Sequence, residues 1–346
     1  MRYFPPRGLG RTAAYQRYYL LGLEETARVH WDGPPLVARL FPGVDLKFRL
    51  VYNRERARVS LGRGSRGTEG FVGRYVVELD GASVRFAIDA HDARVVRDEG
   101  ALAWSDLYFK SNRWAAVQYD TKVQPLVNGN GLLDRGRLEL LRRLRGHDRQ
   151  VDVAFISNVY GGRSHVVRMF EKLAALPIRA DLLAIFDGAD PDADAREMAR
   201  LRSAGVPVST RQLSPPELWA RLARAEIVLL RSGRHGCVSW RLIDLLCMGA
   251  CILIDAPLHS PWPVQLRDGW ELADCGIDRA PDDRAAPDDE YDKLSARVMD
   301  LLERPALLEQ LRGGAARYFD DHASPARVAE YVLQACARSS SDPASR

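Results

Sequence analysis

The sequence has few cysteines, few lysines and no long apolar run, and these shortages exclude several classes of protein. The five cysteines are odd in number and form no Cys-x-x-Cys pair, which argues against a disulfide framework or a zinc site. No run of about 18 apolar residues occurs, so we expect no transmembrane segment. The start of the chain, Met1 to Arg7, lacks the apolar core of a signal peptide. We therefore expect a cytoplasmic protein and leave peripheral membrane contact open.

The charge balance is also modest. The 50 basic and 46 acidic residues give a formal net charge of +4, which provides no case for nucleic-acid binding. Nearly all the basic residues are arginine, which makes planar, bidentate contacts to phosphate and carboxylate. A GC-rich genome would also enrich arginine, so this composition alone does not assign a phosphate ligand.

The length of 346 residues predicts two domains of about 150 residues each. The Gly-rich breaker Asn128 to Gly131 precedes a basic helix, and we place the domain boundary shortly after that helix. The predicted organisation is a first domain at residues 1–148, a second at 149–322, a crossover helix at 323–337 and a disordered tail at 338–346.

Alternation of apolar strands with helices predicts an α/β fold for the second domain. Continuous apolar runs such as Val151 to Ile156 are typical of parallel strands that are covered on both faces. Ser214 to Glu217 forms a capping box, which predicts a helix start between two such strands. The first domain is richer in strands, with Tyr75 to Leu79 and Val84 to Ile88 among them.

Two loops should meet at the carboxyl ends of the parallel strands, where ligands bind in open α/β sheets. The loop from Arg231 to Val238 contains two glycines, and we predict Ser239 as the N-cap of the helix that follows. That helix start, with nearby arginines, would bind an anion. The loop from Ser157 to Ser164 offers a second such helix start. For the first segment the alternative is a surface Arg–Asp pair without a ligand. For the second it is a solvated helix start.

The residues around this predicted anion site resemble a known family. The segment Glu226 to Asp255 resembles the donor-binding segment of GT-B glycosyltransferases, and most of all their exostosin-like branch. The match is Ser239-Trp-Arg-Leu-Ile-Asp244, followed by Met248-Gly-Ala-Cys-Ile-Leu-Ile254. The resemblance extends over roughly residues 150–336. The broader class has a further Glu eight positions before the carboxylate, where this chain has Gly236.

The resemblance implies two Rossmann-like domains with a parallel sheet each, the first more β-rich, and a C-terminal helix that crosses back. It also implies transfer of a hexose from a nucleotide-diphosphate sugar to the hydroxyl of a carbohydrate, lipid-linked or small-molecule acceptor, without metal or cofactor. Asp244 would hold the ribose. The expected donor-binding residues are Gly161, Gly162, Arg163, His165, Arg231, Arg234, His235, Ser239, Arg241 and Asp244.

The catalytic base is expected in the first domain, where a predicted strand ends in three titratable residues. Asp89, His91 or Asp92 would deprotonate the acceptor hydroxyl. A polar turn at a strand end is the alternative. Two other functions stay open, namely a nucleotide-sugar epimerase or hydrolase and a non-catalytic module that binds carbohydrate or protein, because a fold does not fix a reaction.

Overall fold

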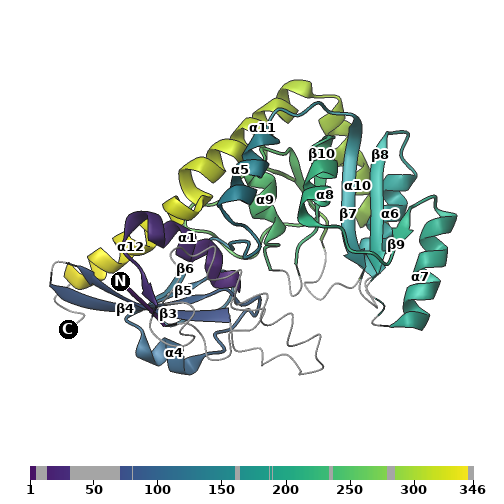
Figure 1. Cartoon of the computed structure of the whole chain (residues 1–346). Coiled ribbons are helices and arrows are strands. Elements are labelled where there is room, and N and C mark those ends of the chain that lie inside the picture. The colour runs from purple at the N-terminus through teal and green to yellow at the C-terminus, as the bar shows by residue number, and fades with distance from the viewer. Residues whose placement is uncertain are drawn as a thin grey trace. The chain divides into compact units, whose positions relative to one another are not determined.

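The structure is a computed structural model, and its chain divides into two compact units (Figure 1). Unit 1 comprises Met1–Glu139, Ser260–Gln265 and Asp320–Arg346, and unit 2 comprises Leu140–His259 and Leu266–Phe319. The structure describes residues 1–4, 14–31, 71–79, 81–159, 164–186, 188, 190–233, 237–278 and 285–341.

Unit 1 contains a mixed six-stranded sheet in the order β2-β1-β3-β4-β5-β6. Its strands are β1 (Arg2–Phe4), β2 (His30–Trp31), β3 (Val72–Leu79), β4 (Ala82–Asp89), β5 (Leu107–Lys110) and β6 (Val123–Pro125). Strand β3 pairs antiparallel with β1 and β4, whereas β4, β5 and β6 are parallel. The first sheet is thus mixed, and the expected parallel pairing is found in its β4-β5-β6 part. Only two residues separate β3 from β4, too few for a crossover, and Gly81 supplies the positive φ of 79° in that turn.

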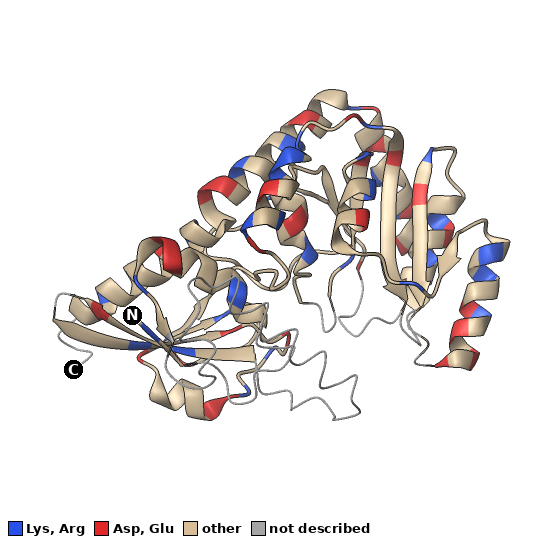
Figure 2. Cartoon of the chain, viewed as in Figure 1, with Lys and Arg blue, Asp and Glu red and all other residues tan. Residues whose placement is uncertain are grey.

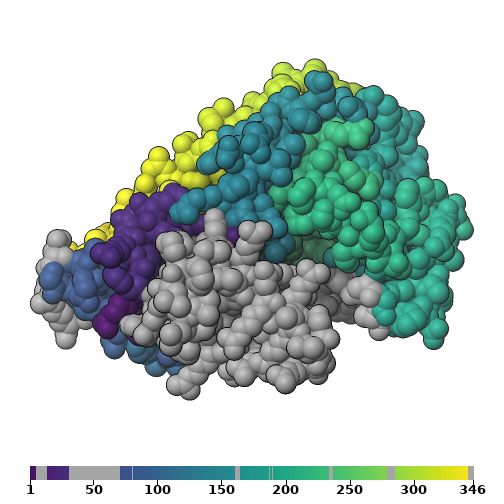
Figure 3. All heavy atoms as spheres, viewed as in Figure 1, coloured from purple at the N-terminus to yellow at the C-terminus, as the bar shows by residue number. Residues whose placement is uncertain are grey.

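The described helices of unit 1 are α1 (Gln16–Thr26), α4 (Glu99–Trp104) and α12 (Pro325–Ser341). Helix α12 packs against α1, and a Cβ on Gly22 would lie 1.8 Å from the carbonyl oxygen of Pro325. The chain thus returns to its first unit at residue 320, as the expected crossing helix requires. Helix α12, at the yellow end of the chain in Figure 3, continues to Ser341, whereas a disordered tail was expected from residue 338.

Unit 2 contains an all-parallel six-stranded sheet in the order β12-β11-β10-β7-β8-β9. Its strands are β7 (Val151–Val159), β8 (Ala180–Phe186), β9 (Val208–Ser209), β10 (Ala225–Leu230), β11 (Ile252–Ile254) and β12 (Ala273–Asp274). The helices between strands are α6 (Ser164–Ala174), α7 (Pro191–Ser203), α8 (Pro215–Leu222) and α9 (Arg241–Cys247). The expected α/β class with a parallel second sheet is confirmed.

Alternation along β7 explains how this sheet is covered on both faces. Val153 and Phe155 belong to a buried cluster with residues of α6 and of the C-terminal helices α10 (Glu290–Leu302) and α11 (Pro305–Tyr318). Ala154 and Ile156 are also buried and point to the opposite face, where α8 packs on β7 and β10. The predicted capping box is confirmed at the start of α8.

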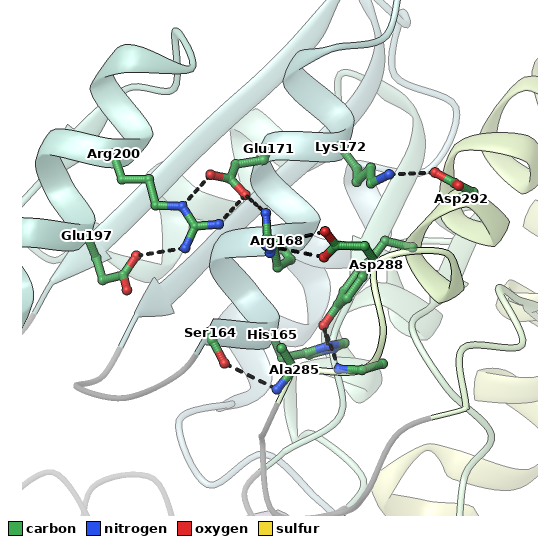
Figure 4. Close-up of polar contacts among 12 residues, drawn as sticks. Ser164, His165, Arg168, Glu171, Lys172, Glu197, Arg200, Ala285, Asp288 and Asp292 are labelled. Carbon is green, nitrogen blue, oxygen red and sulfur yellow. Dashed lines mark hydrogen bonds and ion pairs between the residues drawn. The ribbon is translucent and has the colours of Figure 1, made fainter.

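The outer helices of unit 2 carry charged residues that form ion pairs between them. Helix α7 has acidic residues in its first turn and basic residues in its last, which complements the helix dipole (Figure 2). Ion pairs join α6 to α7 through Glu171 and Arg200, and α6 to the start of α10 through Lys172 and Asp292 (Figure 4). These pairs are partly exposed, so each adds little to stability.

The division into units differs in detail from the predicted domains. Helix α5 (Arg135–Arg143) spans the change from unit 1 to unit 2, which comes at residue 140 instead of 149. A short π-helix, Phe319–Ala323, precedes α12. Within the described part of the chain, no helix combines the length and apolarity needed to cross a membrane.

Candidate functional site

Two of the predicted donor-binding arginines converge on β7 in unit 2. Arg231 follows β10, and its Nε donates to the hydroxyl of Ser157 at 3.0 Å. Arg241 lies in the first turn of α9, and its guanidinium donates to the carbonyl oxygen of Ile156 at 2.6 Å. Because Ile156 and Ser157 are neighbours, the structure brings two arginines from separate segments to one place near the carboxyl end of the central strands.

The predicted cap at Ser239 is wrong. Helix α9 begins at Arg241, and its N-cap residue, Trp240, makes no side-chain capping bond. Trp240 has nearly helical angles of −59° and −18°, and the backbone N–H of Leu242 donates to Ser239 O at 2.9 Å. The chain therefore enters the helix through a tighter turn, in which the Ser239 hydroxyl accepts only a long bond of 3.4 Å from the N–H of Arg241.

Asp244, the predicted ribose ligand, is buried in α9. Its Oδ2 accepts a hydrogen bond from Trp219 Nε1 of α8 at 3.0 Å. The side chain has 1% of its surface exposed. The carboxylate therefore links two helices inside unit 2, and contact with a ribose stays a prediction.

His165 lies at the start of α6 and is fully buried. Its Nδ1 is 2.8 Å from the hydroxyl of Tyr291, and its Nε2 is 2.9 Å from Asp255 Oδ2. The other oxygen of Asp255 accepts from both the backbone N–H and the hydroxyl of Ser232, at 2.9 and 2.8 Å. His165 is thus held by residues of its own unit, and its contact with a diphosphate stays a prediction.

Figure 4 shows the neighbourhood of His165. The neighbouring Ser164 hydroxyl accepts from the N–H of Ala285 at 3.2 Å, which joins the start of α6 to the segment before α10. The predicted donor-binding residues Gly161, Gly162, Arg163, Arg234 and His235 lie outside the described residues.

In unit 1, Asp89 ends β4 as a buried carboxylate. Its Oδ2 accepts from Lys110 Nζ and from the Tyr108 hydroxyl, each at 3.0 Å, and its Oδ1 accepts from the N–H of His91 at 2.8 Å. Burial raises the pKa of Tyr108, and the nearby Asp89 raises it further, so this hydroxyl remains a donor. Three donors within unit 1 therefore hold the Asp89 carboxylate, and its role as a base stays a prediction.

The two other predicted bases differ from Asp89 in exposure. His91 is half-buried against Phe71, and its Nδ1 accepts from the N–H of Ala93 at 2.8 Å. This bond occupies Nδ1 as an acceptor, and the role of His91 as a base stays a prediction. Asp92 is also half-buried, and its backbone carbonyl accepts from Asn112. The role of its carboxylate as a base stays a prediction.

Three residues of the unit 2 site were missed by the sequence analysis. Ser232 is the second residue after β10 and Asp255 the first after β11, so their position at strand ends was a usable signal. Tyr291 lies within α10, 126 residues after His165, and no local pattern indicated it. Among the described residues, no group of three or more His, Cys, Asp or Glu side chains has the arrangement of a metal site.

Comparisons with known proteins find similarity in structure alone. No protein-family model matches the chain, and neither does any curated protein sequence. The structure of Anabaena Alr3699/HepE in complex with UDP and glucose aligns over 68% of this chain at a TM-score of 0.46 and 10% identity. A glycosyltransferase from Rickettsia africae ESF-5 aligns over 67% of this chain at a TM-score of 0.45 and 10% identity.

The alignments cover 64% of the Anabaena chain and 63% of the Rickettsia chain, so this chain spans less than two thirds of each. MurG of Acinetobacter baumannii aligns over 94% of this chain and 77% of its own length, at a TM-score of 0.39 and 10% identity. At these TM-scores and identities, the similarity establishes neither an activity nor a ligand for this chain.

Proposed function

We propose that this chain is a GT-B glycosyltransferase that moves a sugar from a nucleotide-diphosphate donor to an acceptor hydroxyl. One observation carries the proposal, namely the convergence of Arg231 and Arg241 on residues 156 and 157 of β7. Parallel α/β sheets bind ligands beyond the carboxyl ends of their strands, and both arginines lie there. The segment Ser239 to Asp244 adds the resemblance to the exostosin-like branch.

The chemistry of the transfer explains the need for these arginines. When the sugar leaves, negative charge develops on the departing diphosphate. Guanidinium groups that are already held in place stabilise this charge through charge-assisted hydrogen bonds. Two arginines would supply the positive charge that a bound metal supplies elsewhere, so we propose a reaction that is independent of metal and cofactor.

The acceptor and the setting are parts of the same proposal. We propose a carbohydrate, a lipid-linked sugar or a small molecule as the acceptor, with Asp92 as the base. All five cysteines are buried free thiols, which is consistent with a reducing, cytoplasmic compartment.

A thermal-shift screen against UDP, GDP, dTDP, ADP and CMP tests the donor site. A nucleoside diphosphate at about 100 times its Kd should stabilise the chain by about 2.7 kcal/mol and raise the Tm. Arg231→Ala and Arg241→Ala should each reduce that shift. Arg179→Ala is the matched control, because Arg179 pairs with Asp152 at the amino end of the strands. An equal loss in all three variants, or no shift with any nucleotide, would contradict the proposal.

A non-catalytic module that binds nucleotide sugars is the second candidate. In this candidate Asp89, which accepts from Lys110 and Tyr108, has a structural role and not a catalytic one. Incubation with a donor that raises the Tm, followed by measurement of released nucleoside diphosphate with and without candidate acceptors, separates the two. Acceptor-dependent release that Asp92→Asn abolishes supports the transferase.

A further inference from the structure

We propose that Asp255, His165 and Tyr291 form a positioning chain that sets the place of Arg231 in the nucleoside-diphosphate site. This inference rests on the proposed function. None of the three side chains is exposed, so they would act through Arg231 and not by touching the donor.

This positioning chain of hydrogen bonds links four separate segments of unit 2. Tyr291 belongs to α10, His165 to α6, Asp255 follows β11 and Ser232 follows β10. The hydrogen bonds between consecutive members are all 2.8 to 2.9 Å long. A continuous set of short hydrogen bonds between rigid elements holds Ser232 more firmly than bonds within its own segment would.

The donor and acceptor roles agree at every step of the positioning chain. The Tyr291 hydroxyl accepts from the N–H of Ala286 at 3.2 Å, so its own hydrogen is available to His165 Nδ1. The ring then carries its proton on Nε2 and donates it to Asp255 Oδ2. A neutral His165 therefore satisfies both of its partners.

Ser232 transmits this arrangement to Arg231. Its N–H and hydroxyl donate to Asp255, while its carbonyl oxygen accepts from the Arg231 guanidinium at 3.0 Å. The guanidinium is then held between Ser232 O and the Ser157 hydroxyl. A displacement of Asp255 would move the Ser232 peptide and, with it, the arginine. Misplacement of a binding group by about 1 Å can cost up to about 100-fold in rate.

The test compares two substitutions at one position. His165→Leu removes both hydrogen bonds, whereas His165→Gln keeps one acceptor and one donor. We expect His165→Leu to weaken binding of the preferred nucleoside diphosphate about tenfold by calorimetry and to raise the donor KM more than it lowers kcat. His165→Gln should recover part of that loss. Hydrogen exchange without ligand should quicken at the amide of Ser232 in His165→Leu.

A control separates positioning from general stability. Asp181→Asn breaks a partly buried ion pair with Arg221 near the amino end of β8, so it should lower the Tm without changing the Kd. Measurements are made well below the Tm of each variant, and Tyr291→Phe replaces His165→Leu if the latter does not fold. Unchanged affinity in a folded His165→Leu or Tyr291→Phe overturns the proposal. Absence of binding by the unaltered chain rejects the proposed function itself, which is measured first.

Discussion

Each of the two sheets has a buried aspartate at the end of a strand, and the two differ in their partners. Asp89 of unit 1 meets the ammonium of Lys110 at 3.0 Å, and both side chains are at most 1% exposed. Asp255 of unit 2 meets the ring of His165 at 2.9 Å and the two donors of Ser232. The first partner is a lysine ammonium, whereas the second is an imidazole ring whose other nitrogen bonds to the Tyr291 hydroxyl.

This difference assigns the two carboxylates different tasks. A buried ion pair requires both members, because loss of one leaves the other uncompensated in the interior. The stability of unit 1 therefore depends on Asp89. Under our proposal, Asp255 positions Ser232 and, through it, Arg231, so the loss of Asp255 should affect the place of Arg231 more than stability. Sequence alone shows both as an aspartate after an apolar strand.

Substitution of Asp89 should give the largest effect. Asp89→Asn leaves Lys110 buried without its counter-charge, and we expect a loss of about 3–5 kcal/mol in the free energy of unfolding. Denaturant titration followed by circular dichroism measures it. The double variant Asp89→Asn, Lys110→Met should recover much of the loss, because it removes both charges. A loss below about 1 kcal/mol in the single variant would make the two aspartates alike and break the comparison.

Substitution of Asp255 should affect nucleotide binding more than stability. Asp255→Asn keeps an oxygen for Ser232 but presents an N–H to His165, so we expect a smaller stability loss of about 1–2 kcal/mol. Binding of the nucleoside diphosphate should weaken about tenfold because the loop shifts. Calorimetry and denaturant titration on one preparation test both parts. A stability loss as large as that of Asp89→Asn, with unchanged affinity, would contradict the account.

Much of unit 2 could be predicted because its signals are local. The apolar run at Val151, the capping box at Ser214 and the alternation of strands with helices all act within a few residues. The antiparallel pairing of β3 and β4 was also readable, since only two residues separate the strands. The resemblance predicted the parallel pairing of β4, β5 and β6 in the same sheet.

The site was less predictable because its contacts are distant in sequence. His165 meets a carboxylate 90 residues later and a hydroxyl 126 residues later, so its interior role had no local sign. The expected location of Arg231 and Arg241, beyond the carboxyl ends of the parallel strands, agrees with the structure. The alternation of strands and helices along the chain determines which loops lie at those ends. The cap at Ser239 failed because Trp240 enters the helix in a tight turn that a residue preference does not reveal.

The smallest predicted effect lies beside Asp255. Burial raises the pKa of Asp274, and the nearby carboxylates of Asp268 and Asp255 raise it further. Because the folded pKa exceeds the unfolded one, stability present in acid is lost as the pH rises through the folded pKa. Asp274→Asn should therefore raise the Tm at about pH 7, by no more than about 3 °C, and leave it unchanged at about pH 3. An equal gain at both pH values would exclude an electrostatic cause.

The central claim is that a nucleoside diphosphate binds where Arg231 and Arg241 converge on β7, and hydrogen exchange with and without the nucleotide tests it most directly. We predict that the nucleotide that gives the largest thermal shift slows exchange in peptides covering residues 156–159, 231–233 and 241–244 of unit 2. This protection should be lost in Arg241→Ala and retained in Arg179→Ala. Protection confined to other segments, or identical protection in both variants, would contradict the claim.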